Sequence, residues 1–376
     1  MVKKIKIQNY KSVQDLTLEL GRINVLIGAN GCGKSNILEA IAFGSAAADD
    51  KLGNEFLSAR GIRVTDPIWM RSGFSKKSQT ETIDLNVFVS DEKFELKIRN
   101  ENKPFSEWDV IKNNGINSEE YLIELFQKGD GFVDYDYEKF KKLLLELNLD
   151  SILKYSSFSH FLIYAIEETS IRRFEDDEKA KVLGIRGEGL FKLLFEMNQN
   201  QPEEFHEIIE NLELIDWFEG FEIPKDLVFT ERRIRIKDRF LEEGLQYFDQ
   251  RSSNEGFLFL MFYFALFISK YTPKFFAIDN IDASLNPKLC IELIKILTIL
   301  AKKHDKQVIF TTHNPAILDG LNLNDDEVRL LVVSRNRDGH TKMKRILPVE
   351  VPEGKVPVRL SEQFMRGYIG GLPKNF

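Results

Sequence analysis

A glycine-rich loop near the start of the chain constrains its fold more than any other feature. Residues 28–35 read Gly-Ala-Asn-Gly-Cys-Gly-Lys-Ser and match G-x-x-x-x-G-K-[ST] in full. The apolar run INVLI (23–27) precedes the loop, and the helix-like run ILEAIAFGSAAA (37–48) follows it. A strand, such a loop and a helix in this order form a P-loop, because small residues let backbone N–H groups wrap a phosphate at the helix N-terminus. The sequence therefore predicts an α/β fold that binds a nucleotide.

The residues of the loop and of the segment after the first helix have separate expected roles. We expect Lys34 to reach the β- and γ-phosphates and the Ser35 hydroxyl to be a Mg²⁺ ligand. Cys32 lies at a helix start, which could lower the pKa of its thiol; the simpler alternative is a small residue that fills the loop. Arg60 and Arg63 either reach phosphate or DNA or pair with nearby acidic residues. The predicted nucleotide-binding residues of the loop are Asn30, Gly31, Cys32, Gly33, Lys34, Ser35 and Asn36.

Two later strands end in polar residues. Residues 274–279 (KFFAID) form an apolar strand that ends in Asp279. This is the form of a Walker B segment, whose carboxylate holds Mg²⁺ at the carboxyl edge of the sheet. A further strand, 307–311, leads to His313, whose ring could hydrogen-bond a γ-phosphate. A lone Asp or His after a strand is usually structural, but here both follow a complete P-loop in order, so we predict a metal site at Ser35 and Asp279.

Strands alternate with helices on both sides of a central block of different composition. From about Glu101 to Lys225, Leu, Phe, Glu and Lys recur at helical spacing, with few β-branched runs. This pattern predicts an α/β head interrupted in sequence by a helical insertion, which serves a protein contact or, alternatively, a structural lid. The predicted parts are an N-terminal lobe with the P-loop (1–100), the insertion (101–227) and a C-terminal lobe with the tail (228–376).

The composition of the chain indicates the cellular compartment and the kinds of partner that suit it. Its two cysteines, Cys32 and Cys290, cannot build a disulfide framework, which favours a reducing compartment. The first residues lack the apolar core of a signal peptide, and no run of about 20 apolar residues exists. A net charge of −7 argues against a surface that binds nucleic acid over its whole extent, although a local basic groove survives this average. We expect a soluble, cytoplasmic protein with no membrane contact.

Four stretches of the sequence resemble the ABC-type ATPases of the RecF, SMC and OLD group, in their short bacterial AAA-domain form. They are IKIQNYKSVQDLTLEL, INVLIGANGCGKSN, FFAIDNIDASLNP and VIFTTHNP. The resemblance covers residues 1–100 and 228–347. It implies a P-loop NTPase head of the ABC type, with a mixed sheet, flanking helices, and ATP and Mg²⁺ as cofactors.

The resemblance also implies a second copy of the chain. The Ser-x-Gly helix start of the family corresponds here to the degenerate segment 251–258 (RSSNEGFL). In the family, this segment of one head faces the nucleotide of another, so Ser253, Asn254 and Gly256 are predicted to bind a partner's nucleotide. A homodimer or higher homo-oligomer is therefore expected. Ser252 and Ser253 also suit an N-cap for the next helix, and both roles can hold together.

One position departs from the pattern of the family. A glutamate normally follows the Walker B aspartate and orients or deprotonates the attacking water, but here the residue is Asn280. An amide can orient water but accepts no proton, and loss of a general base costs roughly 10²–10⁴ in rate. Three interpretations stay open: Asp282 replaces the base, His313 positions the water, or the chain binds ATP tightly and hydrolyses it slowly.

The role of ATP binding is inferred from the resemblance alone. OLD-type relatives carry a C-terminal nuclease domain, and residues 314–376 are too few for one, so we expect a separately encoded effector of the nuclease class. Short ATPases of this group resemble components of anti-phage defence, so the leading expectation is a nucleotide-dependent scaffold or sensor that controls the effector. The alternative is a RecF-like ATPase that binds DNA in repair or chromosome maintenance, through basic residues at 232–237 and 342–345. A transporter subunit is disfavoured by the insertion, the missing Gln-loop and the degenerate signature.

Overall fold

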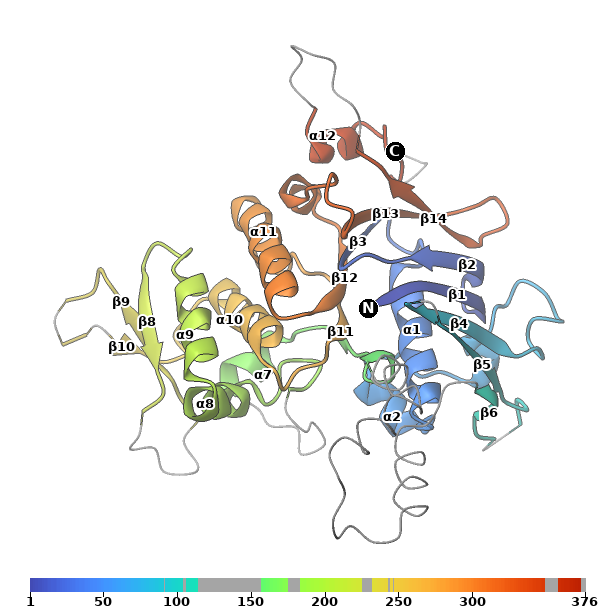
Figure 1. Ribbon diagram of the computed structural model, residues 1–376, viewed down its shortest axis with the longest axis horizontal. Helices are drawn as coiled ribbons and strands as arrows, with labels where there is room; N and C mark the ends of the chain where they lie inside the picture. Colours follow the sequence, from blue (N-terminus) through green and yellow to red (C-terminus); the bar gives the residue numbers. More distant parts are fainter. Residues whose placement is uncertain are drawn as a thin grey trace, which may run out of the picture.

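The described residues form two larger sheets, a group of helices and a small third sheet (Figure 1). The computed structural model describes residues 1–90, 92–103, 106–113, 157–174, 183–224, 232–242, 244–245, 247–348 and 358–372. The arrangement matters for function because it brings the ends of several distant strands to one edge of the central sheet.

The central sheet has six strands, and the P-loop strand β3 (Ile23–Ile27) lies inside it. The order is β14-β13-β3-β12-β11-β7; β14 is antiparallel to β13, and the other neighbours are parallel. β3, β11 and β12 are buried along their whole length, as expected for parallel strands that are covered on both faces. The other strands are β7 Ile163–Tyr164, β11 Phe275–Ile278, β12 Gln307–Thr312, β13 Val328–Arg335 and β14 Thr341–Ile346.

An antiparallel sheet of five strands shares a core with helix α1 (Lys34–Ala48) and one face of the central sheet. Its order is β2-β1-β4-β5-β6, and β4 alternates buried and half-exposed residues. The packing of α1 is close: a Cβ at Gly44 would lie 2.5 Å from a methyl carbon of Leu85 on β4. The elements of this side are β1 Val2–Tyr10, β2 Val13–Glu19, α2 Asn54–Ala59, α3 Pro67–Met70, β4 Ile83–Val89, β5 Glu92–Arg99 and β6 Asp109–Asn113.

Helices cover the opposite face of the central sheet. Helix α10 (Glu255–Ile268) is buried at every residue from Phe257 onward, which explains a helix that is apolar all round. Beyond α10, helices α8 and α9 lead to a three-stranded sheet of order β10-β9-β8 (Figure 1). The remaining elements are α7 Glu168–Arg173, α8 Leu190–Asn200, α9 Pro202–Leu212, β8 Phe218–Glu222, β9 Arg235–Asp238, β10 Tyr247–Phe248, α11 Pro287–Lys303, the 3-10 helix η1 Pro315–Gly320 and α12 Leu360–Met365.

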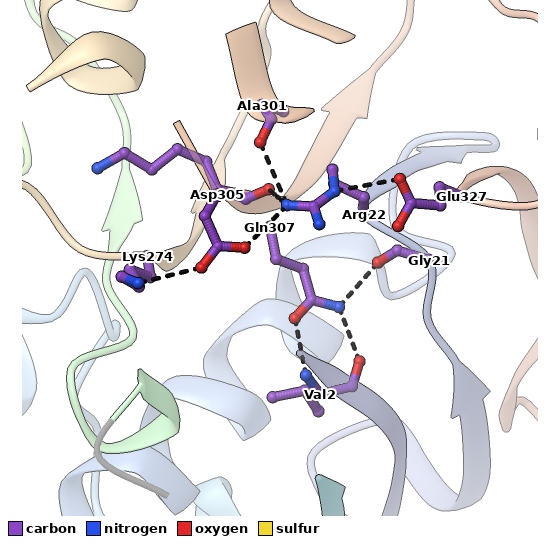
Figure 2. Close-up of polar contacts among 9 residues, drawn as sticks. Val2, Gly21, Arg22, Lys274, Ala301, Asp305, Gln307 and Glu327 are labelled. Atoms are coloured by element: carbon purple, nitrogen blue, oxygen red, sulfur yellow. Dashed lines mark hydrogen bonds and ion pairs between the residues drawn. The ribbon is translucent and has the colours of Figure 1, made fainter. Parts of the chain in front are cut away.

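Polar side chains join the two larger sheets at the edge where β12 begins (Figure 2). Gln307 is 3% exposed; its Oε1 accepts from the Val2 N–H at 2.9 Å, and its Nε2 donates to the carbonyls of Val2 and Gly21, both at 2.7 Å. Beside it, Arg22 donates to the Asp305 carboxylate at 3.2 Å. One buried side chain thus connects β1 of the five-stranded sheet with β12 of the central sheet.

The predicted α/β architecture, a mixed sheet with flanking helices, is confirmed. The three-part division of the chain remains a prediction. Within 101–227, β6 belongs to the five-stranded sheet and β7 to the central sheet, so this part is not wholly helical. Residues 104–105, 114–156, 175–182 and 225–227 of the predicted insertion lie outside the described residues. In the part of the chain that is described, no helix is long and apolar enough to cross a membrane.

Candidate functional site

The predicted phosphate and metal residues meet at the carboxyl edge of the central sheet. Because β3, β11 and β12 are parallel neighbours, the P-loop, Asp279 and His313 follow strand ends on the same side. They border a cavity of about 450 Å³, a size that suits a small-molecule ligand. The lining residues are Asn30, Gly31, Cys32, Gly33, Lys34, Ser35, Asn36, Arg63, Asp279, Asn280, His313 and Arg335.

The P-loop requires glycine at two of its positions. Gly33 has a φ of +110°, and a Cβ there would lie 2.1 Å from the Thr341 hydroxyl oxygen. A Cβ at Gly28 would lie 2.2 Å from the Val333 carbonyl oxygen. Cys32 is buried, and this burial raises the pKa of its thiol although neighbouring positive charge opposes the shift. A thiol in this setting fits the loop-filling alternative and not an activated nucleophile.

Ser35 and Asp279 form a pair of adjacent oxygen donors. The Ser35 hydroxyl donates to Asp279 Oδ2 at 3.3 Å, and the Thr311 hydroxyl donates to the other carboxylate oxygen. Octahedral Mg²⁺ takes oxygen ligands at about 2.0–2.1 Å, so neighbouring ligands lie about 3 Å apart. The two side chains therefore fit the metal that a P-loop implies, and Thr311 holds the carboxylate in place.

Lys34 lies folded over the loop that precedes it. Its ammonium group donates to the carbonyl of Gly28 at 2.8 Å and to that of Ala29 at 3.3 Å. Burial lowers the pKa of Lys34, and nearby negative charge, including that of Asp279, opposes the shift. A phosphate beside this amine would be a stronger acceptor than either carbonyl and would favour the charged form.

The three catalytic candidates differ in their placement. Asn280 and His313 line the cavity, whereas Asp282 does not, and instead accepts a hydrogen bond from the Thr312 hydroxyl at 2.6 Å. Asn280 has a φ of +56°, and its N–H donates to the Thr311 hydroxyl at 2.9 Å. Burial, followed by the nearby lysine charge, lowers the pKa of His313, which makes its ring mostly neutral at pH 7.

The segment predicted to face a second copy lies at the start of α10, outside the cavity lining. Asn254 is the N-cap, because its Oδ1 accepts from the Phe257 N–H at 2.8 Å; this corrects the cap predicted at the preceding serines. Gly256 packs closely against the turn that follows β11, because a Cβ on Gly256 would lie 2.9 Å from the Ser284 carbonyl oxygen. Ser253 is 6% exposed, and its hydroxyl has no hydrogen-bond partner among the described residues.

Two arginines line the cavity beside the P-loop and the strand-end residues. Arg63 does so while it pairs with Glu39, which is the acidic pairing expected as one alternative. Arg60 pairs with Asp49 at 2.9 Å and does not line the cavity. Arg335 reaches the cavity from the end of β13. It was not predicted from the sequence, because no sequence motif indicates which strand pairs with the P-loop strand.

Comparison with known proteins assigns a family. Residues 23–319 match the family described as “AAA domain, putative AbiEii toxin, Type IV TA system”. The matched range begins at β3 and includes the P-loop, the start of α10, Asp279 and His313.

Curated relatives match shorter parts of the chain. An uncharacterized protein of Methanocaldococcus jannaschii is 31% identical over 112 residues, 28% of this chain and 50% of that protein. The OLD nuclease of Thermus scotoductus is 34% identical over 64 residues, 17% of this chain and 11% of the nuclease. The DNA double-strand break repair Rad50 ATPase of Sulfolobus acidocaldarius is 47% identical over 45 residues, 12% of this chain and 5% of Rad50. The chain thus spans half or less of the length of these relatives.

Solved structures share the fold. An SMC head bound to the C-winged helix domain of ScpA has a TM-score of 0.55 at 16% identity, covering 92% of this chain and 98% of that one. An SMC head with an extended coiled coil, bound to the C-terminal domain of ScpA derived from Pyrococcus furiosus, has a TM-score of 0.50 at 17% identity, covering 92% and 96%. The chain belongs to the AAA-domain family named above, and it shares the fold of an SMC head.

Proposed function

We propose that the chain binds ATP and Mg²⁺ in the cavity at the carboxyl edge of the central sheet. The observation that carries this proposal is the meeting of Lys34, Ser35 and Asp279 on one cavity of about 450 Å³. Lys34 supplies positive charge for the β- and γ-phosphates, and Ser35 and Asp279 supply oxygen ligands for the metal. The metal would offset phosphate charge and fix the orientation of the triphosphate.

ATP in this site is hydrolysed slowly. Asn280 holds the position that a glutamate takes in related ATPases, and its amide accepts no proton. Asp282 accepts a hydrogen bond from the Thr312 hydroxyl and does not line the cavity. It is therefore poorly placed to act as a substitute base. His313, mostly neutral at pH 7, can orient water or a phosphate oxygen. We therefore favour a long-lived ATP-bound state among the three interpretations.

That ATP-bound state joins two or more copies of the chain. The Ser253 hydroxyl is buried without a partner among the described residues, at the N-terminus of α10 where N–H groups favour an anion. A γ-phosphate presented by a second copy would satisfy this hydroxyl, with Asn254 and Gly256 beside it. Arg172 of α7 supports the segment, since it donates to the carbonyls of Arg251 at 2.8 Å and Ser253 at 2.7 Å.

The ATP-bound oligomer is a scaffold or sensor that controls a separately encoded effector of the nuclease class in anti-phage defence. The family description supports a paired system, because it names a toxin of a type IV toxin–antitoxin system. One relative is itself called an OLD nuclease. The two free, buried cysteines fit a protein of the reducing cytoplasm.

A RecF-like ATPase that binds DNA is the second candidate. The Rad50 relative is named for DNA double-strand break repair, and Lys342 and Lys344 are exposed on the edge strand β14. Purification of the chain with the products of its native operon, followed by mass spectrometry, separates the candidates. A copurified nuclease or toxin would favour the first, and repair or replication proteins would favour the second.

Calorimetric titration with Mg-ATP tests the binding site itself. Lys34→Ala should weaken ATP binding tenfold or more, because a charge-assisted hydrogen bond contributes about 1.5–3 kcal/mol. Asp279→Ala should weaken binding more with Mg²⁺ than without it. Lys302→Ala, on the exposed side of α11, is the matched control and should bind like wild type. Equal affinity of wild type and Lys34→Ala would refute the P-loop assignment.

A further inference from the structure

We propose that Arg335 is a second phosphate-binding residue of this site, supplied by a hairpin outside the P-loop motif. The proposal rests on the proposed binding of ATP and adds to it a residue far from the loop in sequence. Arg335 is the last residue of β13, and residues 336–340 connect it to β14. In the sheet, Arg335 lies directly opposite Thr341, the first residue of β14.

The hairpin is fixed against the P-loop on both sides of Arg335. On one side, the Val333 carbonyl oxygen lies against Gly28, where a Cβ would approach it to 2.2 Å. On the other side, the Thr341 hydroxyl donates to the Cys32 carbonyl at 3.1 Å. These contacts leave the backbone of Arg335 little freedom to move relative to the loop, so its side chain is presented to the cavity from a defined position.

The three cations of the cavity differ in what they bind. Lys34 donates to the carbonyls of its own loop, and Arg63 is paired with Glu39. Arg335 is exposed, and its side chain makes no hydrogen bond or ion pair with any residue that the structure describes. A guanidinium carries five N–H donors in a planar fork that matches phosphate oxygens. Asp279 is the one carboxylate among the lining residues, and the metal would engage it.

The charge of Arg335 already acts on the loop. Burial is the main influence on the pKa of the Cys32 thiol and raises it, whereas the charges of Lys34 and Arg335 oppose that rise. Arg337, two residues further along the same hairpin, is exposed but does not line the cavity. Arg337 is therefore a solvent-exposed arginine of the same hairpin without a place in the cavity, and it serves as the matched control.

Binding of inorganic tripolyphosphate and of ATP, each with Mg²⁺, tests the inference. Tripolyphosphate carries the phosphates without base or ribose, so it separates a phosphate contact from stacking on the base. Arg335→Ala should weaken both ligands about tenfold, and Arg335→Lys should retain part of the affinity. The loss should shrink at high salt, because an exposed charge contact is screened. Arg337→Ala should bind both ligands like wild type.

Each remaining outcome is decisive. If Arg335→Ala binds both ligands like wild type while Lys34→Ala does not, Arg335 is not a phosphate ligand and the ATP site stands. A loss confined to ATP would assign Arg335 to the base or ribose and overturn the inference, as would a wild type that fails to bind tripolyphosphate. Equal ATP binding by wild type and Lys34→Ala would instead overturn the proposed function. Circular dichroism of each variant reports whether the fold is retained.

Discussion

Asn280 adopts a left-handed backbone conformation, and its amide side chain cannot act as a general base. Its φ of +56° lies in the left-handed region, which asparagine tolerates better than glutamate. Its carbonyl accepts from the Ala283 N–H at 3.0 Å, so the residue begins a tight turn. The side chain at the same position lines the cavity and accepts no proton. The geometry of the turn therefore suits the residue to which the proposed function attributes slow hydrolysis.

A carboxylate at position 280 should speed ATP hydrolysis. Asn280→Asp keeps the size of the side chain and tolerates the turn, whereas Asn280→Glu reaches further but should lower stability by about 1 kcal/mol. Both variants should release phosphate at least about tenfold faster than wild type, because a general base contributes roughly 10²–10⁴. Phosphate release at saturating Mg-ATP measures the rate, and thermal unfolding measures the stability.

The competing interpretation makes Asp282 the base, and Asp282→Asn is its test. In that case wild type turns over briskly and Asp282→Asn stops it. If wild type hydrolyses ATP quickly and none of the three substitutions changes the rate, our account of this position is wrong.

The site was predictable at the residues that belong to motifs. The P-loop, Asp279, Asn280 and His313 follow strand ends that sequence patterns identify, and parallel strands carry them to one edge. Arg335 was not predictable, because its place depends on β13 lying next to β3, a pairing between residues far apart in sequence. The N-cap was assigned to the serines because a preference for capping residues does not choose among Ser, Ser and Asn in a row.

At the scale of elements, the shortest strands were missed for a physical reason. β7 has two residues, and its pairing with β11 joins positions far apart in the chain. Two residues cannot show a period of two, so the helical spacing of the surrounding block dominated the prediction. The buried strands β3, β11 and β12 were predictable because burial on both faces leaves a continuous apolar run.

The side chain of Gln307 should contribute strongly to the joining of the two larger sheets. Gln307→Leu leaves the buried N–H and carbonyl of Val2 and the carbonyl of Gly21 without this partner (Figure 2). We expect the free energy of unfolding in urea to fall by about 2–4 kcal/mol. Gln8→Ala is the matched control, since Gln8 makes an exposed hydrogen bond to Asp15, and its cost should be below about 1 kcal/mol. Equal costs for the two variants would contradict this role.

The start of α10 should be needed for pairing of heads but not for binding of ATP by one head. Gly256 is a poor place to test this, because any side chain there meets the Ser284 carbonyl within the same copy. Ser252 is exposed, so Ser252→Arg adds bulk to the segment without disturbing its packing. We expect unchanged ATP affinity by calorimetry and loss of ATP-dependent closure. Tyr271→Arg, beyond the other end of α10, should close normally; closure by Ser252→Arg as well would show that the segment does not face a partner.

For the whole molecule, the structure separates two parts that the proposed chemistry must bring together. The cavity lies at the carboxyl edge of the central sheet, and the segment around Ser253 does not line it, so under the proposed function a second copy must complete the site. Each copy carries a net charge of −7, which opposes association at long range. Salt screens this repulsion beyond about 8–10 Å, so short-range contacts to the bound nucleotide must drive closure.

Fluorescence energy transfer between copies tests nucleotide-dependent closure most directly. Both native cysteines are buried, so Ile299→Cys, at a site 65% exposed on α11, offers one accessible thiol for a donor or an acceptor dye. In a mixture of donor- and acceptor-labelled chains, Mg-ATP should raise the transfer in the otherwise unchanged protein. The same labelled chain with Lys34→Ala or Ser252→Arg should show no rise, whereas an open oligomer alone would give a constant signal. Transfer that does not respond to Mg-ATP, or that rises equally with Lys34→Ala, would contradict the account.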